Sequence, residues 1–138
     1  MTTRAPSFER GDVVLALYSH SDLRTAKLRP VLVVQANDLG TGLPQLIVAM
    51  VTSQMSRAGH PSRVTVLLST PNGVQSGLLT DSVVMTDNLA TIFESEIRRR
   101  IGSLPMSEVD TALRHTLGLD APPPAPSSIP ATSRPTAG

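Results

Sequence analysis

The sequence predicts a mainly β protein of the α+β class, a small and strongly bent barrel that a C-terminal helix closes. Short runs rich in valine, leucine and isoleucine recur between turn-forming segments, a spacing typical of small antiparallel barrels. An apolar periodicity typical of a helix follows near the C-terminus. The 138 residues favour one domain, and its core must be aliphatic because hydrophobic residues make up 40% and aromatic ones only 2%.

The first half of the chain is expected to hold three strands. Residues 12–18 carry apolar side chains too closely spaced for one buried face, so both faces of this strand should be covered. Residues 19–28 are polar and charged, which predicts a loop. Pro30 should open the second strand, where a missing N–H does little harm. Residues 37–42 have turn chemistry, and residues 46–51 form the third strand.

The second half continues with shorter strands. A loop at 56–61 precedes a fourth strand at 64–68. Pro71-Asn72-Gly73 is a strong turn signal, because proline fixes the first corner and Asn-Gly tolerates positive φ. Residues 78–85 and 90–93 are expected to form two further short strands.

One helix is expected after these strands. Ser107 and Asp110 match the S-x-x-D pattern of a helix start, and Gly118 stands where a C-terminal cap belongs. The side chains spaced to share one face of this helix are Val109, Ala112, Leu113, Thr116 and Leu117.

The chain is expected to divide into a folded domain at 1–119 and a tail at 120–138. The tail is rich in proline, alanine and serine, and such a composition cannot bury apolar area. The sequence therefore predicts a disordered tail.

Several classes of protein are excluded by composition. The chain has no cysteine, and His20, His60 and His115 lack metal-ligand spacing, so no metal site or cofactor is expected. No apolar run approaches the ~20 residues of a membrane span, and the N-terminus has no signal segment, which indicates a cytoplasmic protein without membrane contact. The net charge is only +1, which fits a short single-stranded nucleic acid in a local groove better than a long duplex.

Arg29 and the Thr52-Ser53 pair are the residues best suited to chemistry. Arg29 lies where a charged loop meets a strand, and the two hydroxyls end the next strand. A guanidinium holds two phosphate oxygens through parallel N–H donors, and a hydroxyl can donate to a third. Arg29 would thus stabilise the charge of a pentacovalent phosphate. The alternatives are an ion pair of Arg29 with Asp22 and a local backbone bond from the hydroxyls.

Four segments in this order resemble the MazF/PemK toxins of toxin–antitoxin systems, from about residue 10 to residue 119. They are residues 11–14, residues 27–35 with Arg29-Pro30, residues 46–54 ending in Thr52-Ser53-Gln54, and residues 77–84. The resemblance implies an SH3-like, strongly bent barrel of the CcdB/Kid/MazF type, assembled as a homodimer. It also implies a sequence-specific, metal-independent endoribonuclease that cleaves single-stranded RNA and is neutralised by a cognate antitoxin.

The resemblance makes Arg29 and Thr52 the catalytic pair. The substrate-binding residues are then expected to be Ser53, Gln54, Arg24, Lys27, Arg57 and Asp87.

Two positions depart from the family pattern. Arg24 stands where many members have a loop glutamate, and Met85 stands where the Kid branch has a catalytic arginine. The general base is therefore not assigned by the resemblance. His20 is one candidate, although an isolated loop histidine is usually only solvated.

Two further choices remain open at the level of sequence. The run Arg98-Arg99-Arg100 is either a solvated strand edge or a patch that follows phosphates. The alternative functions are a non-catalytic CcdB-like toxin and an inactive family member that binds a protein or nucleic acid. Arg29 together with Thr52 argues against the first, because a protein-directed toxin needs no phosphate clamp. The departure at Arg24 leaves the inactive family member open.

Overall fold

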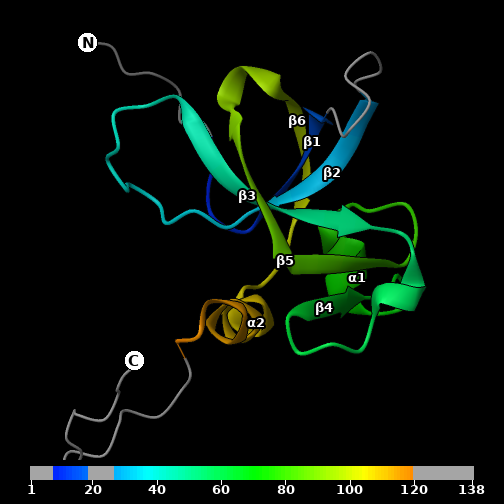
Figure 1. The fold of residues 1–138 in the computed structure, drawn as a ribbon. Helices are drawn as coiled ribbons and strands as arrows, with labels where there is room; N and C mark the ends of the chain where they lie inside the picture. Colours follow the sequence, from blue (N-terminus) through cyan, green and yellow to red (C-terminus); the bar gives the residue numbers. More distant parts are fainter. Residues whose placement is uncertain (1–7, 19–26, 120–138) are drawn as a thin grey trace, which may run out of the picture.

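The computed structural model describes residues 8–18 and 27–119, which form one antiparallel sheet with helices along it (Figure 1). The sheet has six strands in the order β4-β5-β3-β2-β1-β6. Its strands are β1 (Asp12–Tyr18), β2 (Lys27–Val33), β3 (Gln45–Thr52), β4 (Arg63–Val66), β5 (Ser82–Phe93) and β6 (Ile97–Ser103). The helices are α1 (Pro71–Ser76) and α2 (Ser107–Leu117), with short 3-10 turns η1 (Met55–Arg57) and η2 (Glu94–Glu96).

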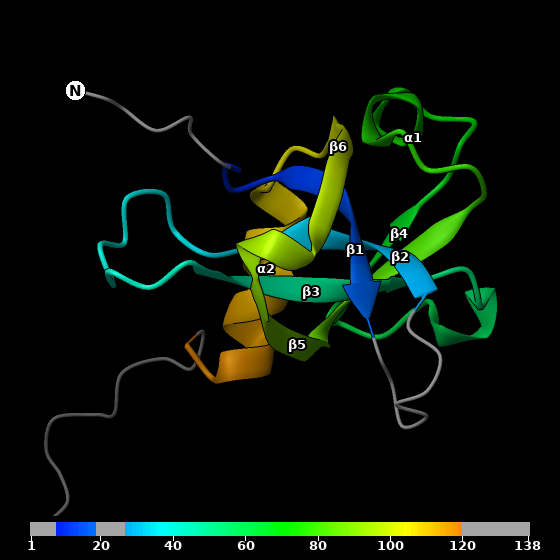
Figure 2. The same ribbon diagram turned by 90° about the horizontal axis from the view of Figure 1, so that it is seen from above.

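The sheet bends so strongly that it buries two apolar clusters, one on each face (Figure 2). Val13 of β1 belongs to the cluster that α2 covers through Val109. The neighbouring Val14 belongs to the second cluster, with Val31 and Val48. All five side chains are at most 1% exposed, which confirms that both faces of the first strand are covered.

Helix α1 lies between the two edge strands of the sheet and completes the bent barrel. Within the described residues, β4 and β6 share no ladder. Gly77 ends α1 with φ 73°, and a Cβ at this position would collide with the carbonyl group of Ile101 in β6. A Cβ on Gly102 would likewise collide with the backbone of Ser76. Because only glycine permits this backbone contact, the α1 turn is fixed against β6.

The turn predicted at Pro71-Asn72-Gly73 is wrong, because these residues form the first turn of α1. The Thr70 hydroxyl oxygen accepts a hydrogen bond from the Gly73 N–H at 3.1 Å, and proline occupies the first helical turn. Both are features of a helix start.

The two short strands predicted at 78–85 and 90–93 are a single strand, β5, and residues 78–81 precede it without strand structure. A register shift explains the length of β5. Ala49 of β3 is opposite Leu89, whereas the next residue, Met50, is opposite Met85. The polar residues that suggest a break between two strands instead lie at this irregularity, inside one continuous strand.

Strand β2 begins at Lys27, before the start predicted at Pro30. The proline is tolerated because β2 is paired only with β1 at this position, and the ladder to β3 begins at Val31. A missing N–H therefore interrupts no bond to β3.

Helix α2 occupies the range predicted for the C-terminal helix, and Gly118 caps it with φ 74°. Its N-cap is Met106 without a side-chain cap, so the S-x-x-D pattern begins one residue inside the helix. The predicted tail at 120–138 lies outside the described residues. None of the helices in the described ranges has the length and apolar character needed to span a bilayer.

Candidate functional site

A groove of about 660 Å³ lies where the ends of β2 and β3 meet the Gly77–Ser82 segment and β6. Part of its lining is apolar and includes Leu15, Val51 and Leu78. The polar residues that line it are Arg29, Thr52, Ser53, Gln54, Thr80, Ser82, Arg99 and Arg100. The groove thus combines three guanidinium groups with hydroxyls and aliphatic side chains, which suits an anion carrying an apolar or aromatic group.

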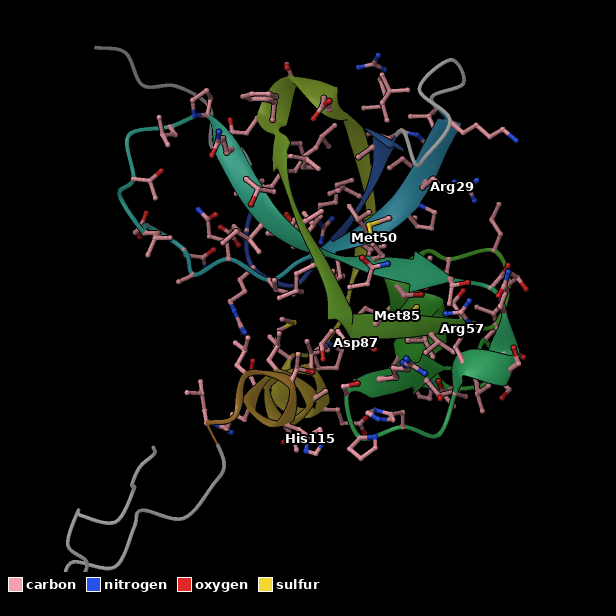
Figure 3. The ribbon with its side chains drawn as sticks, in the orientation of Figure 1. Arg29, Met50, Arg57, Met85, Asp87 and His115 are labelled. Atoms are coloured by element: carbon pink, nitrogen blue, oxygen red, sulfur yellow. The ribbon has the colours of Figure 1, made fainter. Side chains whose placement is uncertain are left out.

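Arg29 enters the groove from a fixed backbone. Its Cα is paired with Ala16 of β1, and the strand residues that follow, beginning with Val31, are buried. The Arg29 side chain is exposed at the outer end of β2 (Figure 3). Because the core does not depend on this side chain, Arg29 can serve a ligand while the sheet fixes its starting point.

Thr52 ends β3 opposite Val83 of β5 and is half-buried in the groove wall. Its Oγ1 accepts a hydrogen bond from the Gln54 N–H at 3.1 Å. This is the local backbone bond that a strand-ending threonine commonly makes. The hydroxyl proton remains available for donation, since a threonine hydroxyl is one donor and two acceptor sites. The two roles considered for Thr52 are thus compatible.

The arginine run 98–100 divides between the two roles considered for it. Arg99 and Arg100 line the groove, whereas Arg98 is not among its lining residues and donates to the Ser95 carbonyl oxygen at 3.3 Å. Arg100 Nε donates to Asp12 Oδ1 at 2.8 Å. The part of the groove lining that β6 supplies is therefore cationic.

The remaining predicted substrate-binding residues are placed differently. Lys27, Arg57 and Asp87 do not line the groove. Figure 3 shows Arg57 on the η1 side and Asp87 nearer to α2. Arg24, like the alternatives His20 and Asp22, lies outside the described residues.

Asp87 forms an ion pair with Arg63 that joins β5 to β4. The carboxylate accepts from Arg63 Nη2 at 2.8 Å and from Nε at 3.3 Å. Arg63 Nη1 also donates to the Arg57 carbonyl oxygen at 3.2 Å. The hydrogen-bonded Arg63 guanidinium holds the pKa of the Asp87 carboxyl below its usual value.

Sequence reasoning missed the part of the groove wall formed by Leu78, Leu79, Thr80 and Ser82. All four lie in the range 78–85 that the sequence predicts as a strand, and they reach the groove because Gly77 docks on β6. Met85, at the position of the Kid-branch arginine, is 8% exposed and its Cα is paired with Met50 (Figure 3). Across the described ranges, no cluster of three or more histidine or carboxylate side chains could hold a metal ion.

Comparisons with known proteins identify the family. The profile of the PemK-like, MazF-like toxins of type II toxin–antitoxin systems matches residues 9–117. Endoribonuclease MazF6 of Mycobacterium tuberculosis and endoribonuclease MazF2 of Mycobacterium bovis are each 34% identical over 103 residues, covering 72% of this chain and 86% of theirs. A solved mycobacterial endoribonuclease in complex with its cognate antitoxin is 26% identical, with TM-score 0.63, covering 86% of this chain and all of that one. The chain belongs to the PemK-like, MazF-like toxin family of type II toxin–antitoxin systems.

Proposed function

We propose that this toxin is a sequence-specific, metal-independent endoribonuclease whose active site is the groove lined by Arg29 and Thr52. The observation that carries the proposal is the convergence of these two residues, from the ends of different strands, on one groove. The endoribonuclease relatives support the same reaction class. A CcdB-like toxin directed at a protein would not require this cationic groove.

The reaction is attack of a ribose 2′-oxygen on the adjacent phosphorus, with cleavage of the bond to the 5′-oxygen. The products are a 2′,3′-cyclic phosphate and a 5′-hydroxyl. Arg29 donates hydrogen bonds to two non-bridging oxygens as negative charge develops on the pentacovalent phosphate. The Thr52 hydroxyl donates a hydrogen bond to the same group. The described lining of the groove has no carboxylate or imidazole, so the 2′-hydroxyl gives its proton to solvent or to a residue beyond this lining. The leaving 5′-oxygen takes up a proton from the same sources, which gives the 5′-hydroxyl.

Single-stranded RNA is the substrate that fits the groove and the charge of the chain. Three guanidinium groups line the groove, yet the net charge of the whole protein is +1, so the attraction is local. Leu28 and Leu79 offer apolar contacts to unpaired bases, and Ser53 and Gln54 offer hydrogen bonds to base edges. Acting on cellular RNA, the toxin works in the cytoplasm.

A cognate antitoxin is the proposed partner, and its flexible segment covers the Arg29 groove. The mycobacterial relative in complex with its antitoxin supports this partner. A segment with acidic and apolar side chains would match both the arginines and the exposed leucines of the groove. Expression of the chain alone should arrest growth, and harmless expression without the product of a neighbouring small gene would contradict this partner.

We also propose a homodimer as the active form. Several large apolar residues of the described surface are exposed outside the groove, among them Leu43 at 57% and Val74 at 74%. Burial of such side chains is a usual source of dimer stability. Sedimentation that shows only monomer at micromolar concentration would contradict the dimer.

Cleavage of a long unstructured RNA by the purified protein tests the proposed function. The expected products carry 2′,3′-cyclic phosphate and 5′-hydroxyl ends at a recurrent sequence, with the same rate in EDTA. Intact RNA, or cleavage that EDTA abolishes, would contradict the proposal.

A further inference from the structure

Arg100 of β6, which lines the groove, forms an ion pair with Asp12 of β1, which is not among the lining residues. Arg100 Nε donates to Asp12 Oδ1 at 2.8 Å, and the Arg100 side chain is 53% exposed while that of Asp12 is 13% exposed. The other carboxylate oxygen of Asp12 accepts from the Glu9 N–H at 2.8 Å. Asp12 is therefore fixed from both sides and can hold the guanidinium of Arg100 in one orientation.

The register of β6 decides which of its arginines shares a face of the sheet with Arg29. In a regular strand, neighbouring side chains point to opposite faces, so Arg99 and Arg100 would separate. Here the ladder to β1 skips Ile101 between Val13 and Val14, and it skips Arg98 between Leu15 and Ala16. Both irregularities flank the arginine pair and neither separates it, so Arg99 stays on the face of its partner Leu15 and Arg100 on the face of Val14. Arg29 is opposite Ala16, which lies on the same face as Val14, so Arg29 and Arg100 share a face.

The bond to Asp12 leaves most of the Arg100 guanidinium free for a ligand. A guanidinium carries five N–H donors, and Asp12 engages only the one on Nε. Within the described part of the chain, the two Nη groups make no hydrogen bond to another residue. These Nη groups have the parallel geometry that binds two oxygens of one phosphate.

We propose that Arg100, oriented by Asp12, binds an RNA phosphate next to the one that Arg29 and Thr52 act on. This inference rests on the proposed function. β1 lies between the strands that carry Arg29 and Arg100, and their partners on β1, Ala16 and Val14, are two residues apart. The two arginines therefore start about 12 Å apart at the usual strand and residue spacings. Arg100 is a substrate-positioning residue, and Asp12 acts through it.

The direction in which Asp12→Asn changes RNA affinity distinguishes two roles of Asp12. A carboxylate beside a phosphate-binding groove repels the ligand, so simple electrostatics predicts that Asp12→Asn tightens RNA binding. If Asp12 instead orients Arg100, Asp12→Asn weakens binding because the guanidinium loses its fixed position. Asp12→Asn should then have no further effect once Arg100 is removed.

The test measures binding of a fluorescent 2′-O-methyl RNA oligonucleotide, which lacks the attacking hydroxyl, together with single-turnover cleavage of ordinary RNA. Arg100→Ala should weaken binding about ten-fold, as expected for loss of a charged hydrogen bond, with the maximal cleavage rate little changed. The slope of log affinity against log salt should become shallower by about 0.7, the value for one phosphate contact on a single strand. Arg100→Lys should restore part of the affinity.

Arg98→Ala is the matched control, because Arg98 is the same residue type on the same strand outside the groove. It should bind and cleave as the wild type does. Asp12→Asn should weaken binding about three-fold or more, less than Arg100→Ala. The double variant should match Arg100→Ala.

Two sets of results would overturn the inference. One is Arg100→Ala indistinguishable from Arg98→Ala in affinity and salt slope; the other is tighter binding by a folded Asp12→Asn. If Asp12→Asn does not fold, the Arg100 variants and their salt slopes decide alone. A wild-type chain that binds the oligonucleotide without cleaving ordinary RNA would refute the proposed function. The affinities of the variants would still decide whether Arg100 binds a phosphate.

Discussion

The Thr52 hydroxyl oxygen accepts a hydrogen bond from the Gln54 N–H at 3.1 Å, at the point where β3 enters the groove. This bond orients the hydroxyl, and its O–H remains free to donate a hydrogen bond to a phosphate oxygen. Thr52→Val keeps the shape of the side chain and removes the donor. We expect cleavage to fall about three- to ten-fold, the effect of one neutral hydrogen bond, in single-turnover assays.

Thr52→Ser is the control for this prediction, because it keeps the hydroxyl and removes only a methyl group. It should cleave close to the wild-type rate. Equal rates for the valine and serine variants would show that the Thr52 hydroxyl has no part in the reaction.

The ion pair of Arg63 with Asp87 predicts a pH-dependent contribution to stability. The pKa of Asp87 is lowered in the folded chain, so its contribution is present above the unfolded pKa and is lost as pH falls through the folded pKa. Asp87→Asn should lower the melting temperature at pH 7. The difference from the wild type should disappear well below about pH 3.9, the ordinary value for aspartate, because the wild type then loses the same charge.

Cleavage by Asp87→Asn is the companion measurement. Asp87 lies outside the groove, so the rate at neutral pH should change little in a folded variant. A large loss of rate with an unchanged melting temperature would instead place Asp87 in contact with the substrate.

Leu79 provides a prediction about base contacts. Its side chain is 93% exposed and lines the groove, which has no aromatic residue in its described lining. Leu79→Ser should weaken RNA binding about three- to ten-fold through lost apolar contact, with no change in melting temperature. Leu117→Ser changes an exposed leucine at the end of α2 and should leave affinity unchanged. Equal affinities for both variants would contradict a role of Leu79 in base binding.

The segment after Asp120 is predicted to be dispensable. Its composition of proline, alanine and serine cannot bury apolar area. A chain that ends at Asp120 should therefore keep the melting temperature and cleavage rate of the full chain. Loss of cleavage by a truncated chain that still folds would assign a function to the tail.

The sequence predicted the local features of the fold well, because they depend on neighbouring residues. The apolar run of β1 and the capping Gly118 of α2 are of this kind. The sequence does not distinguish the helix α1 from a turn, since Thr70-Pro71 can begin either structure. Residues Met85 to Leu89 suggested a strand break, whereas the pairing with β3 carries the strand through an irregularity.

The candidate site was predictable in part for the same reason. Arg29 and Thr52 end strands that the sequence revealed, and the groove brings them together. Asp87 is engaged by Arg63 through the register of β4 with β5, and Gly77 meets β6 through a contact between distant segments. Spacing along the chain contains no signal for such long-range contacts.

The cleavage rate of Arg29→Ala tests the central claim most directly. Loss of a preorganised charged donor should raise the barrier by about 3–4 kcal/mol, so single-turnover cleavage should fall by roughly two to three decades. The melting temperature should be unchanged because the side chain is exposed, and affinity for the 2′-O-methyl oligonucleotide should fall far less than the rate. Arg114→Ala, an exposed arginine of α2, should cleave normally. An Arg29→Ala chain that cleaves at the wild-type rate would contradict the assignment of this groove as the active site.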